Sequence, residues 1–95
     1  MKTPEEILEM AGYNIEELEE EGTILFRNPD YAEAIVGVTD DFRVVYDIDL
    51  MAASLAEEDN ISLTDAFEFI DYNTLRTLPY INGLKPIVMY PLERM

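Results

Sequence analysis

The chain has 95 residues and a mass of 10.9 kDa, a length that predicts a single domain over residues 1–95. Its 21 Asp and Glu residues outnumber its 6 Lys and Arg residues, which gives a net charge of −15. His, Cys and Trp are absent, which excludes disulfides, thiolate chemistry, imidazole metal sites and His-dependent catalytic triads. The 48% of hydrophobic residues favours a folded domain over intrinsic disorder. Without a long apolar run or a signal-peptide pattern, we expect a cytoplasmic protein with no membrane contact.

Two short helices are predicted at the start of the chain. Thr3, followed three residues later by Glu6, is typical of a capping box. Asn14 and Glu17 repeat this spacing, and Gly22 is a typical residue to end the second helix.

A three-stranded meander is predicted next, because β-branched and aromatic residues alternate with turn residues. Its strands are expected at residues 23–26, 31–39 and 43–46, with a turn at 28–30 between the first two. Gly37 lies inside the second of these strands and indicates either a β-bulge or the close approach of another group.

Two further helices and a last strand complete the predicted fold. Asp47 or Asp49 is expected to cap the third helix, Ser62 to start the fourth, and Pro79 to end it. The run Ile87–Tyr90 lies between two prolines, which suits a short edge strand. The predicted fold class is therefore α+β, in the order ααβββααβ. Its helices pack on one face of a small, mainly antiparallel sheet that combines the meander with the C-terminal strand.

The acidic residues are clustered rather than evenly spread. In the second helix, like-charged residues four positions apart share one face, at a cost of about a few tenths of a kcal/mol per pair. One interpretation is a solvated surface that keeps the protein soluble. The other is recognition of a basic partner, because carboxylates can take the places of phosphates, which repeat about every 3.4 Å along a nucleic-acid strand. The candidate partner-binding residues are Glu16, Glu17, Glu20, Glu21, Asp40, Asp41, Glu57, Glu58 and Asp59.

Catalysis finds less support in the sequence. Asp47 and Asp49 offer oxygen ligands for Mg²⁺ or Ca²⁺, yet the same residues serve as helix caps. We therefore predict a non-enzymatic protein with no cofactor, no metal and no direct nucleic-acid binding. Two alternatives stay open: a small carboxylate- or Mg-dependent enzyme, and a subunit or antitoxin-like protein that pairs through an apolar patch or the edge strand Ile87–Tyr90. The polar run Asp71–Arg76 is interpreted as the end of a helix rather than a recognition patch.

A resemblance adds to this prediction. It is carried by Ala34–Val38 with Arg43–Asp47, by Asp65–Thr74, and by Lys85–Tyr90. Over roughly residues 31–90, these strands and helix stripes resemble a group of small acidic bacterial and prophage proteins of unassigned function. The resemblance implies an α+β fold and a setting where anti-CRISPR and anti-restriction inhibitors are common, several of which mimic nucleic acid. The predicted function is thus an acidic inhibitor that binds the basic surface of a nucleic-acid-binding protein.

Overall fold

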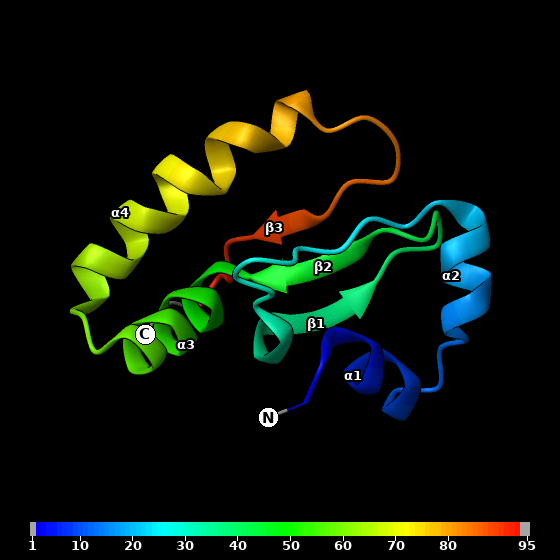
Figure 1. Ribbon diagram of the computed structural model, residues 1–95, viewed down its shortest axis with the longest axis horizontal. Helices are drawn as coiled ribbons and strands as arrows, with labels where there is room; N and C mark the ends of the chain where they lie inside the picture. Colours follow the sequence, from blue (N-terminus) through cyan, green and yellow to red (C-terminus); the bar gives the residue numbers. More distant parts are fainter. Residues whose placement is uncertain (1, 94–95) are drawn as a thin grey trace.

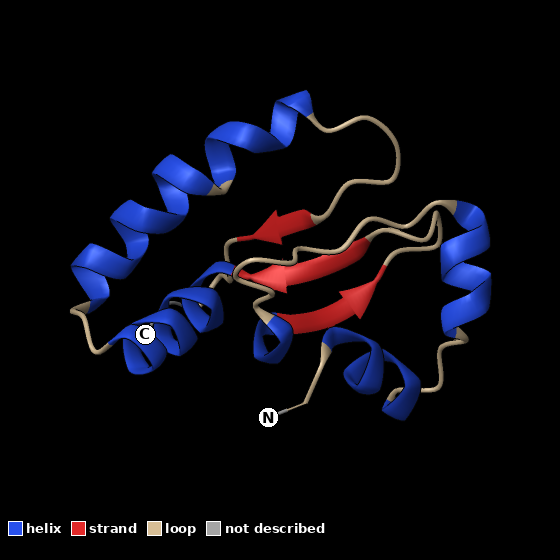
Figure 2. Cartoon of the chain, viewed as in Figure 1, coloured by secondary structure: helices blue, strands red, loops and turns tan. Residues whose placement is uncertain are grey.

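The computed structural model describes residues 2–93, and its Cα atoms extend over 37 × 28 × 26 Å. Within residues 2–93, four α-helices and two 3₁₀ helices pack around a small sheet (Figures 1 and 2). The α+β class of the prediction is confirmed. In chain order the elements are α1 Pro4–Met10, α2 Ile15–Glu21, η1 Ala32–Ala34, β1 Ile35–Val38, β2 Val44–Asp47, α3 Ile48–Asp59, α4 Leu63–Asn73, η2 Leu75–Tyr80 and β3 Ile87–Met89.

Side-chain caps explain where the four α-helices begin. The Thr3 hydroxyl accepts the backbone N–H of Glu6 at 3.1 Å, and the Glu6 carboxylate accepts the backbone N–H of Thr3 at 3.1 Å. Asn14, Asp47 and Ser62 each accept a backbone N–H of the first turn that follows them. These bonds satisfy amides that have no partner inside a helix, and they confirm the predicted helix starts.

The sheet differs from its prediction in pairing. It has three strands in the order β1-β2-β3, with β1 antiparallel to β2 and β3 parallel to β2. The sheet is therefore mixed rather than mainly antiparallel. The predicted order ααβββααβ is wrong, because the chain forms two strands, not three, before α3. Helices α3 and α4 form the long crossover that a parallel pair requires, and β3 lies at the sheet edge as predicted.

Residues 23–26 do not form the predicted first strand. Thr23 makes an isolated bridge with Leu84, and no ladder continues from it. The backbone N–H of Phe26 instead donates to the Tyr46 hydroxyl at 3.3 Å, and the two ring centroids lie 4.7 Å apart. The apolar side chains of this segment therefore cover the sheet rather than extend it.

Two smaller predictions have different outcomes. The β1–β2 register shifts between Ile35 and Gly37, which favours the bulge over the close approach of another group. Helix α4 ends at Asn73, well before Pro79, and Pro79 lies inside η2. The predicted end of the fourth helix is therefore wrong.

The core lies against the face of β2 that carries Val44 and Tyr46, both fully buried. Every α-helix contributes to this cluster, so the helices and the sheet share one core. The helical side chains buried in it are Leu8, Leu18, Ile48, Met51, Ala52, Leu55, Ala66 and Ile70.

Candidate functional site

Two of the predicted acidic clusters form one surface. The hydroxyl of Thr23 donates to the backbone carbonyl of Phe42 at 2.7 Å, which ties the β1–β2 turn to the residue just beyond α2 (Figure 1). Acidic residues of the turn and of the helix are all exposed at this end of the molecule. We call this set the α2 surface, and its members are Glu16, Glu17, Glu20, Glu21, Asp40 and Asp41.

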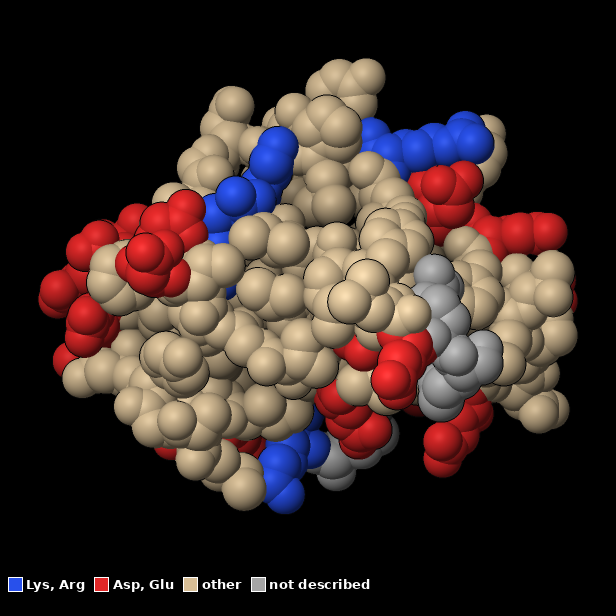
Figure 3. All heavy atoms as spheres, turned by 180° about the vertical axis from the view of Figure 1, so that it is seen from behind, with Lys and Arg blue, Asp and Glu red and all other residues tan. Residues whose placement is uncertain are grey.

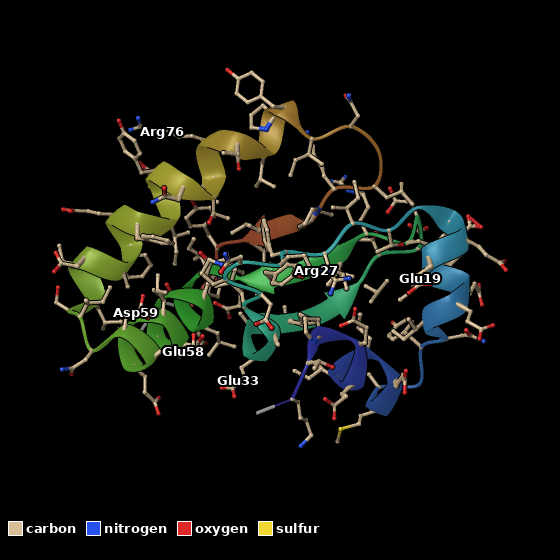
Figure 4. The ribbon with its side chains drawn as sticks, viewed as in Figure 1. Glu19, Arg27, Glu33, Glu58, Asp59 and Arg76 are labelled. Atoms are coloured by element: carbon tan, nitrogen blue, oxygen red, sulfur yellow. The ribbon has the colours of Figure 1, made fainter. Side chains whose placement is uncertain are left out.

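The third predicted cluster lies in the last turn of α3 and lines a groove. Glu57 and Glu58 border a hollow of about 270 Å³, together with Asp30 and Glu33 from the segment before β1. An adjoining hollow of about 560 Å³ shares Asp30 and Glu58 with the first and also includes Asp59. Figure 4 shows Glu33, Glu58 and Asp59 on the side of the molecule where α3 faces η1. We call this set of five acidic residues the α3 groove.

Local structure accounts for the place of each groove residue. The Asp30 carboxylate accepts the backbone N–H of Ala32 at 3.1 Å, at the start of η1. In η1, Ala32 and Ala34 are buried, so Glu33 between them is directed to solvent. Helix α3 has no basic residue in its last turn, so the acids there oppose the helix dipole. The chain carries this electrostatic cost at the groove without local compensation.

Sequence reasoning did not identify Asp30 and Glu33 as site residues. No charge run marks them in the sequence, because each is an isolated acid among uncharged residues. The contact between η1 and α3 that brings them to the last turn of α3 depends on the tertiary fold.

The ion pairs of the described residues do not neutralise either acidic surface. Among residues 2–93, the ion pairs are Arg27–Glu5 at 2.8 Å and Arg76–Asp71 at 3.5 Å, and neither includes a member of the α2 surface or the α3 groove. Arg27 borders the larger hollow, but its guanidinium donates to Glu5. This hydrogen bond lowers the pKa of Glu5. The negative charge of both surfaces is therefore free to act on a partner.

The nine predicted site residues do not form one continuous face. The α2 surface and the α3 groove lie toward opposite ends of the longest axis, which is horizontal in Figure 1. From behind, acidic side chains gather at the α2 end, and much of the middle of the view is uncharged (Figure 3). The structure thus places the candidate binding acids at two separate poles.

Asp47, one of the two candidate Mg²⁺ ligands, has a clear structural role. Its carboxylate accepts the backbone N–H groups of Asp49 at 2.8 Å and Leu50 at 3.2 Å, which caps α3. Within residues 2–93, no group of three or more His, Cys, Asp or Glu side chains is arranged to hold a metal ion. Over the same residues, no helix is both long and apolar enough to cross a membrane.

No family model matches the chain, and no curated protein or solved structure is significantly similar to it.

Proposed function

We propose that this protein is a non-enzymatic inhibitor that binds the basic surface of a nucleic-acid-binding protein by mimicking nucleic acid. The observation that carries the proposal is the pair of acidic poles, the α2 surface and the α3 groove, at opposite ends of the molecule. This function is of the anti-CRISPR or anti-restriction type.

The length of the fold supports mimicry. The longest dimension of the fold is 37 Å, and one turn of B-DNA measures about 34–36 Å. The two poles lie toward opposite ends of this axis, so together they can face a basic surface that contacts phosphates within about one turn of DNA. The net charge of −15 supports the same partner class, because it attracts a basic protein and repels nucleic acid itself.

The α3 groove supports recognition of individual Arg and Lys side chains. Carboxylates from two segments line it, Asp30 and Glu33 from the segment before β1 and Glu57 and Glu58 from the last turn of α3. An Arg side chain entering the groove can donate to carboxylates in a forked geometry, which makes a stronger bond than a neutral donor makes. The proposed mode of binding is thus insertion of basic side chains at this pole and looser charge attraction at the other.

The experiment begins with the immobilised protein, which is used to isolate partners retained at about 50 mM NaCl and released at about 500 mM. The purified partner is then bound to its fluorescently labelled nucleic acid, and this protein is titrated in. We expect displacement of the nucleic acid, followed as a fall in anisotropy, and an affinity that weakens steeply with salt. A partner that binds both at once would contradict mimicry.

Charge reversals assign the binding to the two poles. Glu58→Lys is the sharpest single change, because Glu58 borders both hollows, and we expect it to weaken binding by about tenfold or more. Glu68→Lys is its matched control, since Glu68 is an exposed acid of α4 that borders neither hollow of the α3 groove and is not part of the α2 surface. The combined reversals to Lys at Glu57, Glu58 and Asp59, and at Glu16, Glu17, Glu20 and Glu21, test each pole as a whole. Affinities within about twofold of the unmodified protein for both sets would mean that the charge serves solubility alone.

A further inference from the structure

One long stretch of this acidic chain carries no acid. None of the 21 Asp and Glu residues falls between Tyr72 and Leu92, whereas two cations, Arg76 and Lys85, do. In the fold this stretch forms the end of α4, then η2 and β3. Seen from behind, the upper middle of the molecule is accordingly uncharged apart from a few basic side chains (Figure 3).

This stretch exposes an aromatic and basic ridge. Tyr72 is 67% exposed and Tyr80 is 85% exposed, and the side chain of Arg76, which lies between them in the sequence, is 61% exposed. The Arg76 guanidinium lies 4.5 Å from the centre of the Tyr72 ring, and Figure 4 shows it on the outer side of α4. We call Tyr72, Arg76 and Tyr80 the Tyr–Arg ridge. Helix termination explains Asn73, which donates to the carbonyl of Phe69, but it does not explain this ridge.

Residue types in the ridge are those of protein interfaces. Tyr and Arg are enriched at the centres of interfaces and among the residues that contribute most to binding, whereas Asp and Glu are depleted there. Stacking restricts the Arg76 side chain before any contact is made, which lowers the entropy lost on binding. Burial of the two exposed Tyr rings in an interface would also remove aromatic surface from water, which is favourable.

We propose that the Tyr–Arg ridge is where a second copy of this chain docks, to form a two-fold symmetric dimer. Electrostatics selects this surface, because two chains of charge −15 repel each other wherever their carboxylates meet. The ridge lets them approach without such a contact. It is also self-complementary in charge: Asp71 lies 3.5 Å from Arg76, so a two-fold axis that passes close to this pair can place Arg76 of each copy against Asp71 of the other.

Side-chain packing, rather than strand addition, makes this contact. The edge strand β3 is only three residues long and is preceded by Pro86 and followed closely by Pro91. Proline has no backbone N–H to donate, so the ends of this edge are poor templates for pairing with another strand.

Sedimentation velocity of the full chain tests the proposal directly, over about 5–300 µM protein in about 50 and 500 mM NaCl. We expect a dimer whose fraction rises with protein concentration and rises again at high salt, because salt screens the repulsion between the copies. Salt thus has the opposite effect on dimerisation and on the proposed binding to a basic partner, so the two proposals succeed or fail separately. A single species of 10.9 kDa under all these conditions would overturn the dimer.

Substitutions then locate the contact. Tyr80→Glu places a carboxylate in the ridge and should weaken dimerisation by about tenfold or more, while Tyr80→Phe should leave it within about threefold. Met10→Glu is the matched control, because it adds the same charge at an apolar side chain of α1 that is 72% exposed and outside the ridge. Circular dichroism verifies that each variant is folded.

Equal weakening by Tyr80→Glu and Met10→Glu would show that net charge alone governs the association, and would refute docking at the ridge. If Tyr80→Glu fails to fold, Arg76→Gln replaces it, with the same expected loss and the same control.

Discussion

The side-chain hydroxyls of Tyr31 and Thr74 lie 3.0 Å apart in the interior and join two segments that are distant in the chain. Tyr31 precedes η1, whereas Thr74 links α4 to η2, and both residues are almost completely buried. The bond therefore fastens the segment that carries Asp30 and Glu33 to the far end of α4. The bond gives each hydroxyl a hydrogen-bond partner. This matters because a buried hydroxyl without a partner lowers the stability of the fold.

Removal of either hydroxyl should destabilise the fold, and removal of both should cost less than the sum. Tyr31→Phe and Thr74→Val each leave the other hydroxyl buried without this partner, which we expect to lower the free energy of unfolding by about 1–3 kcal/mol. In the double variant neither hydroxyl remains, so a coupling of about 1 kcal/mol is expected. Urea denaturation of the four proteins measures it. Strictly additive losses would show that the bond contributes nothing specific.

Alkaline pH should unfold the protein partly through Tyr46. Burial raises the pKa of Tyr46 to about 12, whereas in an unfolded chain a tyrosine has a pKa near about 10. The folded state therefore binds the phenolic proton more tightly, so its contribution to stability is complete below about pH 10 and is lost as the pH rises toward 12. Urea denaturation between about pH 8 and 11 should show this decline.

The variant Tyr46→Phe separates the phenol from other alkaline effects. At neutral pH it should cost about 1 kcal/mol, because the backbone N–H of Phe26 loses its acceptor. Above about pH 10 its stability should fall less steeply than that of the unmodified protein. Burial raises the pKa of Tyr31 as well, so part of the slope will remain. An unchanged slope in Tyr46→Phe would contradict the assignment.

Acid should selectively remove the contribution of the Arg27–Glu5 pair. The hydrogen bond from Arg27 lowers the pKa of Glu5, so the unfolded chain takes up this proton first as the pH falls. The stabilisation is therefore present above the ordinary Glu pKa of about 4.3 and is lost as the pH falls through the lower, folded value. Glu5→Gln should cost about 0.5 kcal/mol at pH 7, as expected for a partly exposed pair.

Paired thermal melts of Glu5→Gln and the unmodified protein at pH 7, 5 and about 3 provide the measurement. The two melting temperatures should converge at the lowest pH. Glu9→Gln is the control, since it removes an exposed acid of the same helix that makes no ion pair within the described residues. A gap for Glu5→Gln that persists at about pH 3 would argue against the pair.

Local signals in the sequence predicted the parts of the fold that local hydrogen bonds determine. Thr3 and Ser62 bind the amides of the turns that follow them, over a span of three residues, so their spacing alone identifies the helix starts. Gly37 marked the bulge, because a strand-interior glycine signals irregular pairing. Pairing partners were not predicted in the same way. The run at Thr23–Phe26 has residues typical of a strand, but in the fold it packs against Tyr46 and does not pair as a strand of the sheet.

The candidate site likewise combines residues that the sequence could identify and residues that it could not. Clusters contiguous in sequence, such as Glu57–Asp59, were visible as charge runs. Asp30 and Glu33 join that cluster only through the packing of η1 against α3, which no local pattern reveals. The parallel pairing of β3 with β2 likewise depends on the path of the chain through α3 and α4. The direction in which two strands pair, and the meeting of acids from distant segments, depend on the tertiary fold. The sequence pattern carries little information on either.

Salt should raise the melting temperature. The charge of −15 is held in a fold whose Cα radius of gyration is 13.1 Å, where carboxylates repel one another more strongly than in the extended chain. The last turn of α3 adds an unfavourable dipole interaction at the α3 groove. Screening weakens both penalties, so about 300 mM NaCl should raise the melting temperature by about 5 °C, the shift that corresponds to about 1 kcal/mol in a domain of this size.

Dimerisation at the Tyr–Arg ridge would also raise the melting temperature with salt, so the series is run on Tyr80→Glu at about 5 µM as well as on the unmodified protein. Repulsion within one chain predicts the same rise in both. The combined reversal of Glu57, Glu58 and Asp59 to Lys should reduce the rise, because it lowers the net negative charge and places cations at the C-terminal end of α3. A melting temperature that stays flat or falls with salt would mean that the carboxylates are already compensated in the folded chain.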